Sequence, residues 1–272
     1  MTSTSVAGRL RLQDKVALVF GAGGEVGASV GRELAAQGAR LFLSGRSLEN
    51  VKRTADAVAA YHRLDGLTEL DALDEAAVDR YLDDVVATAG RVDVVFNAMG
   101  PQAVDYGNAT DTMTLPVDKF MLPISTIVAS QFITARATAR YMRREGSGVV
   151  VFLSATPSQG APNTSAVGAA YGALESLTRS LAVDLGQTGV RVVCVRSMGM
   201  AETRVMQQTY ALAAETMGTE KHKVKQAVTS RALLGRSPTL ADTARLVAFL
   251  ASDEAAAITG AIINSSCGQV LD

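Results

Sequence analysis

The chain has no tryptophan, only two cysteines and two histidines among 272 residues, and a net charge of -1. Cys194 and Cys267 are far apart in the sequence, which argues against a disulfide or a cysteine-based metal site and favours a reducing, cytoplasmic location. The near-neutral charge predicts no nucleic-acid partner and no membrane surface. We expect no apolar run that spans a bilayer and no signal peptide in residues 1–13. These absences favour a cytoplasmic protein that acts on a small molecule.

Short apolar runs alternate with amphipathic stretches along the whole chain, and 48% of the residues are hydrophobic. This alternation is typical of an α/β fold: one Rossmann-type, doubly wound parallel sheet of about seven strands with helices on both faces. We predict a single domain over residues 1–272. The predicted strands are 15–20, 40–44, 67–71, 92–97, 148–154, 190–196 and 260–264. The predicted helices are 25–37, 47–61, 74–89, 117–144, 164–187 and 239–251.

Residues 200–235 interrupt this alternation with a helical stretch rich in methionine, threonine and charge. We predict that they form a lid over the substrate, because insertions at strand ends commonly close such sites. The alternative is a plain surface insertion.

A glycine cluster follows the first predicted strand and opens the first predicted helix. Gly21 allows the turn, Gly23 and Gly24 let phosphate oxygens reach the backbone, and Gly27 lets the helix pack closely. The backbone amides of this loop, that of Val26 included, are therefore predicted to hold a dinucleotide pyrophosphate. The alternative is an ordinary glycine-rich turn.

The end of the second predicted strand indicates which cofactor is bound. Enzymes selective for NAD usually place a carboxylate there, but this chain has Gly45 followed by Arg46. A guanidinium can pair with a 2′-phosphate, and Ser44 and Ser47 are predicted to add hydrogen bonds. NADP(H) is therefore preferred over NAD(H), the alternative being a surface arginine near a helix start. Asp71, after the third predicted strand, is expected to accept from the adenine amino group, to cap the helix 73–89, or to do both.

Four further motifs resemble those of the short-chain dehydrogenase/reductase family. They are Asn97-Ala98-Met99-Gly100, Gly189-Val190-Arg191-Val192, the turn from Met198 to Thr203, and Ile258-Thr259-Gly260. The resemblance covers nearly the whole chain and implies that Asn97, Ala98, Gly100 and Thr203 belong to the cofactor site, with Thr203 near the nicotinamide carboxamide. The glycine loop departs from the family pattern at Phe20 and Glu25, and we expect Glu25 to face solvent or a side-chain partner.

In this family a Tyr donates a proton, a Lys four residues later lowers the pKa of that Tyr, and a Ser orients the carbonyl. Aligned without a gap, Val167 falls at the Tyr position and Tyr171 at the Lys position, while Ser154 keeps the Ser position. A second register takes Tyr171 as the catalytic Tyr, but its partner is then Glu175, which would raise the phenol pKa. We prefer the first register, with Ser154 and Tyr171 as candidate catalytic residues.

Both candidates have structural alternatives, a core aromatic for Tyr171 and a strand-end hydroxyl for Ser154. We also expect the loop 156–165 and several methionines to line the substrate pocket. These methionines are Met113, Met121, Met198, Met200 and Met206.

The combined interpretation is an NADP(H)-dependent oxidoreductase with an altered active site, acting on a carbonyl or alcohol or on a conjugated alkene. The alternatives are a nucleotide-binding protein without redox activity and a redox-neutral dehydratase or cyclase. The resemblance implies a homotetramer or homodimer formed through the helices 117–144 and 164–187. An apolar face of the second helix would suit such packing or plain core burial: Ala166, Ala169, Ala170, Ala173, Leu174, Leu177 and Leu181.

Overall fold

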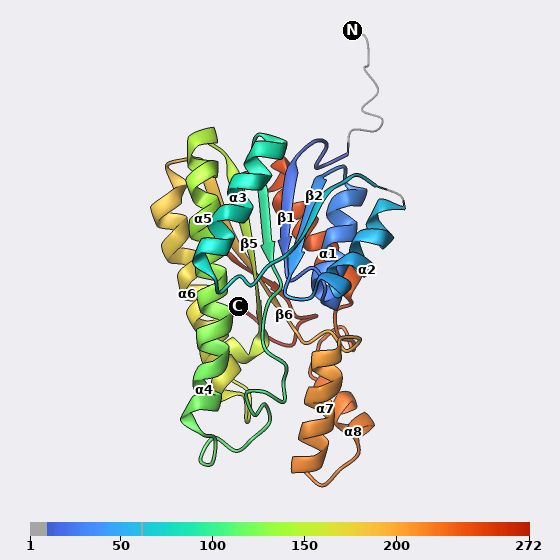
Figure 1. Ribbon diagram of the computed structural model, residues 1–272. Coiled ribbons are helices and arrows are strands. Elements are labelled where there is room, and N and C mark those ends of the chain that lie inside the picture. The colour runs from blue at the N-terminus through green and yellow to red at the C-terminus, as the bar shows by residue number, and fades with distance from the viewer. Residues whose placement is uncertain (1–9, 61) are drawn as a thin grey trace.

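The computed structural model describes residues 10–60 and 62–272 and confirms the predicted fold (Figure 1). Seven parallel strands form one sheet in the order β3-β2-β1-β4-β5-β6-β7. The strands are β1 Val16–Phe20, β2 Arg40–Gly45, β3 Leu64–Glu69, β4 Val94–Asn97, β5 Gly148–Ala155, β6 Val190–Ser197 and β7 Ile262–Ser265. The first nine residues of the predicted domain and the last residue of the predicted helix 47–61 lie outside the described residues.

Helices cover both faces of the sheet (Figure 1). They are α1 Glu25–Ala36, α2 Leu48–Ala59, α3 Glu75–Ala89, α4 Val117–Pro123, α5 Ala129–Glu145, α6 Ser165–Gly186, α7 Arg204–Thr216, α8 Lys221–Thr229 and α9 Leu240–Ala251. One core joins α3, α5 and α6 to the sheet, and the other joins α1, α2 and α9 to it. Along β1, Leu18 and Phe20 belong to the first core, whereas Ala17 and Val19 belong to the second. A strand buried on both faces explains why it reads as a continuous apolar run.

The third strand begins earlier than the predicted range 67–71. Asp65 Oδ2 accepts from Arg40 Nε of the neighbouring strand at 2.6 Å, which ties this end of β3 to β2. Gly66 lies against the Phe42 ring, and a Cβ added there would be only 2.8 Å from it. The pairing register shifts between Leu41 and Phe42 at the same place. An ion pair and a ring contact across strands therefore set the start of β3.

The predicted helix 117–144 is divided in two by a π-helical turn, Ile124–Val128. Pro123 ends α4, and proline has no N–H to continue the α-helical pattern. Within the π-helical turn, the Thr126 hydroxyl donates to the carbonyl of Leu122 at 2.7 Å. Within the described residues, 117–145 is the one helical run long and apolar enough to span a membrane, but α5 packs in the core beside β5. It is therefore a core helix.

The apolar face predicted on α6 is mostly part of the core. Ala166, Ala170 and Leu174 are buried, whereas Ala169 and Ala173 are exposed. Most of this face therefore packs against the sheet, which is the second of the two predicted roles.

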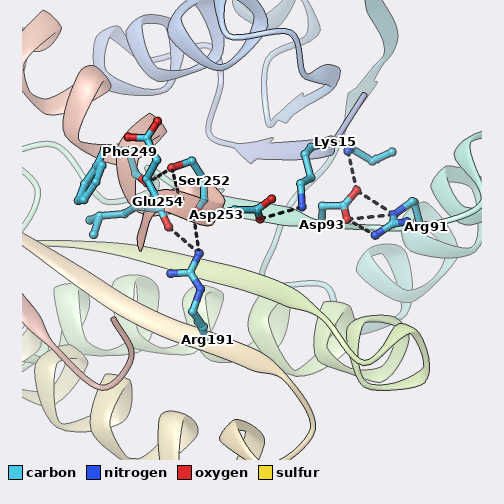
Figure 2. A network of polar contacts seen from close by, with 10 residues as sticks. Lys15, Arg91, Asp93, Arg191, Phe249, Ser252, Asp253 and Glu254 are labelled. Atoms are coloured by element: carbon cyan, nitrogen blue, oxygen red, sulfur yellow. Dashed lines mark hydrogen bonds and ion pairs between the residues drawn. The ribbon is translucent and has the colours of Figure 1, made fainter. Parts of the chain in front are cut away.

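A polar network closes the amino-terminal end of the sheet (Figure 2). The Arg191 guanidinium reaches from β6 to the end of α9 and the segment that follows it. It donates to the carbonyl of Leu250 in the last turn of α9 at 2.8 Å, and to those of Ser252 and Ile258 beyond the helix, both at 3.2 Å. The last carbonyls of a helix have no partner within the helix, so Arg191 acts as a cap for α9. This contact gives a physical reason for an arginine between the apolar residues at the start of β6.

Replacing this cap should destabilise the protein. We expect Arg191→Met to lower the free energy of unfolding by about 2 kcal/mol, because three carbonyls lose a charged donor. Urea denaturation measures the loss. Arg11→Met is the matched control, because Arg11 and its partner Glu254 are both about half exposed, and it should cost less than about 0.5 kcal/mol. Equal losses in the two variants would contradict the capping role.

Candidate functional site

A cavity of about 540 Å³ opens at the carboxyl-terminal ends of the strands. The order of the sheet reverses between β1 and β4, and the residues that follow these two strands form one wall of the cavity. Open α/β sheets bind ligands at this switch point. The cavity is lined by most of the predicted site residues: Gly21, Gly23, Gly24, Val26, Arg46, Asp71, Asn97, Ala98, Gly100, Ser154, Tyr171 and Thr203.

Two predicted site residues, Gly27 and Ser44, do not line the cavity. A Cβ on Gly27 would lie 2.4 Å from the carbonyl oxygen of Gly21, so this glycine allows α1 to pack against the turn after β1. The Ser44 side chain is 1% exposed, and its backbone carbonyl accepts from Ala22 N–H at 2.9 Å. The prediction that the Ser44 hydroxyl contacts a 2′-phosphate is therefore wrong.

The glycine loop leaves β1 in a conformation that disfavours a side chain. Gly21 has φ +77°, and a Cβ there would be 2.9 Å from the Met99 side chain and 3.0 Å from the Ala98 carbonyl carbon. Gly24 is the N-cap of α1 and offers no side-chain acceptor. The first N–H groups of a helix have no partner within it, so those of α1 are available to an anion.

Glu25, the residue that departs from the family's glycine pattern, has a side-chain partner. Its carboxylate lies 3.8 Å from Arg204 Nε at the start of α7. Both residues line the cavity. The expectation that Glu25 faces solvent or a partner is confirmed, and the pair joins the glycine loop to the predicted lid.

The residues after β2 and β3 form another part of the lining. Gly45 and Arg46 line the cavity, Arg46 is exposed, and Ser47 accepts from Asn50 N–H at 3.4 Å as the cap of α2. Asp71 accepts from Leu73 N–H at 3.0 Å. The N-cap of α3 is Asp74, so the prediction that Asp71 caps this helix is wrong.

The polar side chains of Asn97 and Thr203 hold the walls in place. Asn97 donates to the Thr134 hydroxyl at 3.1 Å and accepts from Met99 N–H at 3.0 Å, which joins the end of β4 to α5. Thr203 caps α7 by accepting from Met206 N–H at 3.3 Å. The predicted contacts of these two residues with a cofactor stay predictions.

Helix α6 presents Val167 and Tyr171 to the cavity, one turn apart. Burial, with a smaller contribution from Cys194, raises the pKa of Tyr171 to about 12, so its hydroxyl stays protonated at neutral pH. Tyr171 also packs against the core, as its structural alternative foresaw, and its catalytic role stays a prediction. Of the described residues that line the cavity, none is a lysine.

Glu175, one turn beyond Tyr171, forms a buried ion pair that sequence reasoning did not assign. Its Oε1 accepts from Arg196 Nε at 2.9 Å and its Oε2 from a second guanidinium nitrogen at 2.7 Å. The two side chains are 4% and 6% exposed. Arg196 also pairs with Asp272. Opposite charges at apolar positions of α6 and β6 were the signal in the sequence that could have revealed the pair.

Two serine hydroxyls complete the surroundings of this carboxylate. Ser154 and Ser158 both donate to Oε1 of Glu175, at 2.8 and 2.7 Å. Burial alone would raise the pKa of Glu175, but the hydrogen bonds from Arg196, Ser158 and Ser154 hold it below its ordinary value. Ser154 lines the cavity, and Ser158 does not.

Methionines form part of the apolar wall. Met198, Met200 and Met206 line the cavity as predicted, whereas Met113 and Met121 are exposed elsewhere. No residue from 156 to 165 lines the cavity, so the prediction for that loop is wrong. Sequence reasoning did not assign Gln131, which is buried against the cavity and whose side-chain carbonyl has no hydrogen-bond partner among the described residues.

The stretch 200–235 forms the helices α7 and α8, which project together beyond the sheet (Figure 1). They share a small cluster of buried side chains, Tyr210, Ala214 and Val224. The first residues of this stretch line the cavity, and further along it the Thr209 hydroxyl accepts from the Asn108 side chain at 3.0 Å. That the stretch acts as a lid stays a prediction.

Comparison with known proteins gives consistent similarities over nearly the whole chain. The family model described as Enoyl-(Acyl carrier protein) reductase matches residues 21–269. Versicolorin reductase of Emericella nidulans is 30% identical over 264 residues, covering 95% of this chain and 96% of its own. Levodione reductase of Leifsonia aquatica is 29% identical over 272 residues, covering 99% and 98%. The crystal structure of NAD+-bound xylitol dehydrogenase superimposes with a TM-score of 0.88 at 25% identity, covering 96% and 100%.

Proposed function

The chain belongs to the short-chain dehydrogenase/reductase family, and we propose that it is an NADP(H)-dependent oxidoreductase with an altered active site. Its substrate is a carbonyl compound or alcohol, or a conjugated alkene. The observation that carries the proposal is the cavity at the switch point, which the glycine loop, Arg46 and Ser154 all line.

The glycine loop fits a dinucleotide pyrophosphate. Gly23 and Gly24 expose backbone at the wall of the cavity, and the unpaired N–H groups of the first turn of α1 lie beside them. The positive end of the helix dipole favours the negative charge of a pyrophosphate at this place. The negative charge of Glu25 would repel a pyrophosphate, but the Arg204 guanidinium, 3.8 Å from its carboxylate, offsets that charge.

Arg46 supports a preference for the phosphorylated cofactor. It lines the cavity directly after β2, at the position where a carboxylate would bind the ribose hydroxyls of NAD. A guanidinium offers paired donors to a phosphate, and Ser47 lies next to it in the lining. Asp71 lines the same end of the cavity and is proposed to accept from the adenine amino group.

The proposed alteration concerns proton transfer. A bound nicotinamide supplies or accepts the hydride, and the protein must then orient the reacting oxygen and manage its proton. Val167 offers no proton, and the raised pKa of Tyr171 makes it a weak acid and a neutral hydrogen-bond donor. We therefore propose slow turnover of simple ketones and faster turnover of substrates that stabilise their own oxyanion.

The cofactor assignment is tested by nucleotide titration. Because the chain has no tryptophan, NADPH fluorescence can be followed over a low background. We expect Arg46→Ala to weaken NADPH binding about 10- to 100-fold, the range for lost hydrogen bonds between charged groups. NADH binding should change less than about threefold, since NADH lacks the 2′-phosphate.

Arg53→Ala is the matched control, because Arg53 lies on α2, is exposed and does not line the cavity. Equal losses of NADPH and NADH affinity in Arg46→Ala would refute the preference. A folded protein that binds neither nucleotide would refute the proposed function. Binding without any NADPH consumption across ketones, quinones and enones would favour the redox-neutral or non-redox alternatives.

We also propose a cytoplasmic homodimer or homotetramer that associates through α5 and α6. Phe132 and Val183 are the large apolar side chains that these two helices expose among the described residues. Both would lie in such an interface.

A further inference from the structure

Ser154 is one of the residues that line the cavity, and its hydroxyl hydrogen is directed to Glu175, which does not line it. Ser154 Oγ lies 2.8 Å from Oε1 of Glu175, and an ionised carboxylate can only accept, so Ser154 is the donor. The Arg196 guanidinium contacts both carboxylate oxygens and keeps the group ionised. A group that reaches Ser154 Oγ from the cavity therefore meets the lone pairs of this oxygen and not its hydrogen.

This arrangement reverses what a serine offers to a carbonyl. A ketone oxygen can only accept a hydrogen bond, and the Ser154 hydrogen is already bonded to Glu175. A hydroxyl group can donate to the Ser154 oxygen and at the same time accept from another group in the cavity, such as the protonated Tyr171. The wall at Ser154 is thus complementary to a hydroxyl.

We propose that Ser154 selects a hydroxyl-bearing ligand, an alcohol, enol or phenol whose O–H donates to Ser154 Oγ, with Glu175 as the positioning residue. The inference rests on the proposed function in one respect, which is that the ligand of this cavity is the substrate of the enzyme. It means that Ser154 recognises the alcohol form of a carbonyl/alcohol pair.

A second side chain supports the same ligand chemistry. Gln131, on α5, is 1% exposed and lines the cavity, and its side-chain carbonyl has no hydrogen-bond partner among the described residues. A buried acceptor without a partner is costly, and a donor on the ligand would relieve that cost. Gln131 is therefore a second residue of the lining whose acceptor lacks a partner among the described residues.

The test compares ligands that share a carbon skeleton and differ only at one oxygen. Secondary alcohols of cyclohexane, tetralin and decalin are titrated by NMR beside their methyl ethers and ketones. We expect the alcohol to bind about tenfold more tightly than either partner, as one well-placed hydrogen bond allows. In Ser154→Ala the affinity for the alcohol should fall to the affinity for its methyl ether.

Ser158→Ala is the matched control. Ser158 also donates to Oε1 of Glu175, at 2.7 Å, but it does not line the cavity, so its loss should leave the alcohol preference within about twofold. Ketones that bind as tightly as alcohols in the unmodified protein would overturn the proposal, as would an alcohol preference that survives in Ser154→Ala.

The affinities for the alcohol, ether and ketone are compared with and without nucleotide, and NADP+ and NAD+ are titrated into the same samples. Loss of nucleotide binding with a preserved alcohol ranking contradicts the proposed function alone. Normal nucleotide binding with no alcohol preference contradicts the role of Ser154 alone.

Discussion

Combining Val167→Tyr with Tyr171→Lys is expected to raise the kcat/KM for reduction of a simple ketone by about 100-fold. A positioned general acid contributes about 10²- to 10⁴-fold to such a rate. Val167 and Tyr171 both line the cavity and lie one turn apart on α6, so the new phenol and ammonium would share one face of the helix. The ammonium would lower the phenol pKa toward the working range.

The surroundings of α6 favour this result. Glu175 lies one turn further on, but its carboxylate already accepts from Arg196, Ser154 and Ser158. It therefore has little remaining attraction for a new ammonium at position 171. NADPH consumption with a panel of ketones measures the rate, and circular dichroism with NADPH titration verifies folding and cofactor binding.

The two single variants are the controls. Val167→Tyr adds a phenol without a cation, and Tyr171→Lys adds a cation without a phenol, so each should change the rate less than about tenfold. A folded double variant that binds NADPH but gains no rate would contradict the register that places Val167 at the proton-donor position. A gain in Tyr171→Lys alone would contradict the need for a phenol there.

The fold could be read from the sequence because its signals are local. Apolar runs for strands buried on both faces, and glycines where the chain turns sharply, do not depend on distant residues. The sequence did not predict the start of β3 or the break after Pro123, the first because it depends on a distant contact and the second because it depends on local backbone hydrogen bonding. The Arg40–Asp65 contact depends on a neighbouring strand, whereas the π-turn depends on how the chain around Pro123 re-forms its hydrogen bonds.

The candidate site was predictable where backbone geometry defines it. Gly21 and Gly24 line the cavity as expected, but the orientation of a side chain at a strand end was not visible in the sequence. Ser44 lies at such an end and points into the core. The partner of Ser154 was also not visible in the sequence, because Glu175 lies 21 residues further along the chain. Its contacts with β5 and β6 arise from three segments that are distant in the sequence.

Breaking the buried pair at Glu175 should cause the largest loss of stability. We expect Glu175→Leu to lower the free energy of unfolding by about 3–5 kcal/mol, because Arg196 would stay buried with only the partly exposed Asp272 as a partner. Urea denaturation at neutral pH measures the loss. Lys52→Met removes an exposed pair with Asp56 and should cost less than about 0.5 kcal/mol.

The same carboxylate should make stability depend on pH in a defined direction. Burial alone would raise the pKa of Glu175, but its hydrogen bonds, those of Arg196 first, hold the pKa of the folded chain below the ordinary value of 4.5. The unfolded chain therefore binds the proton more readily, so the contribution is complete at neutral pH and is lost as the pH falls below that value. Glu175→Leu should show a shallower loss of stability on acidification than the unmodified protein.

Removing both charges separates the cost of an unpaired ion from the value of the pair. Glu175→Leu with Arg196→Met leaves no buried charge, and apolar replacements of a buried pair are often neutral, so the double variant should recover more than half of the single variant's loss. It also releases the Ser154 hydrogen from its acceptor, so matched ketones should bind more tightly than they do in the unmodified protein. A single variant that costs no more than Lys52→Met would contradict the buried pair. A recovered double variant with unchanged ketone affinity would contradict the control of Ser154 by Glu175.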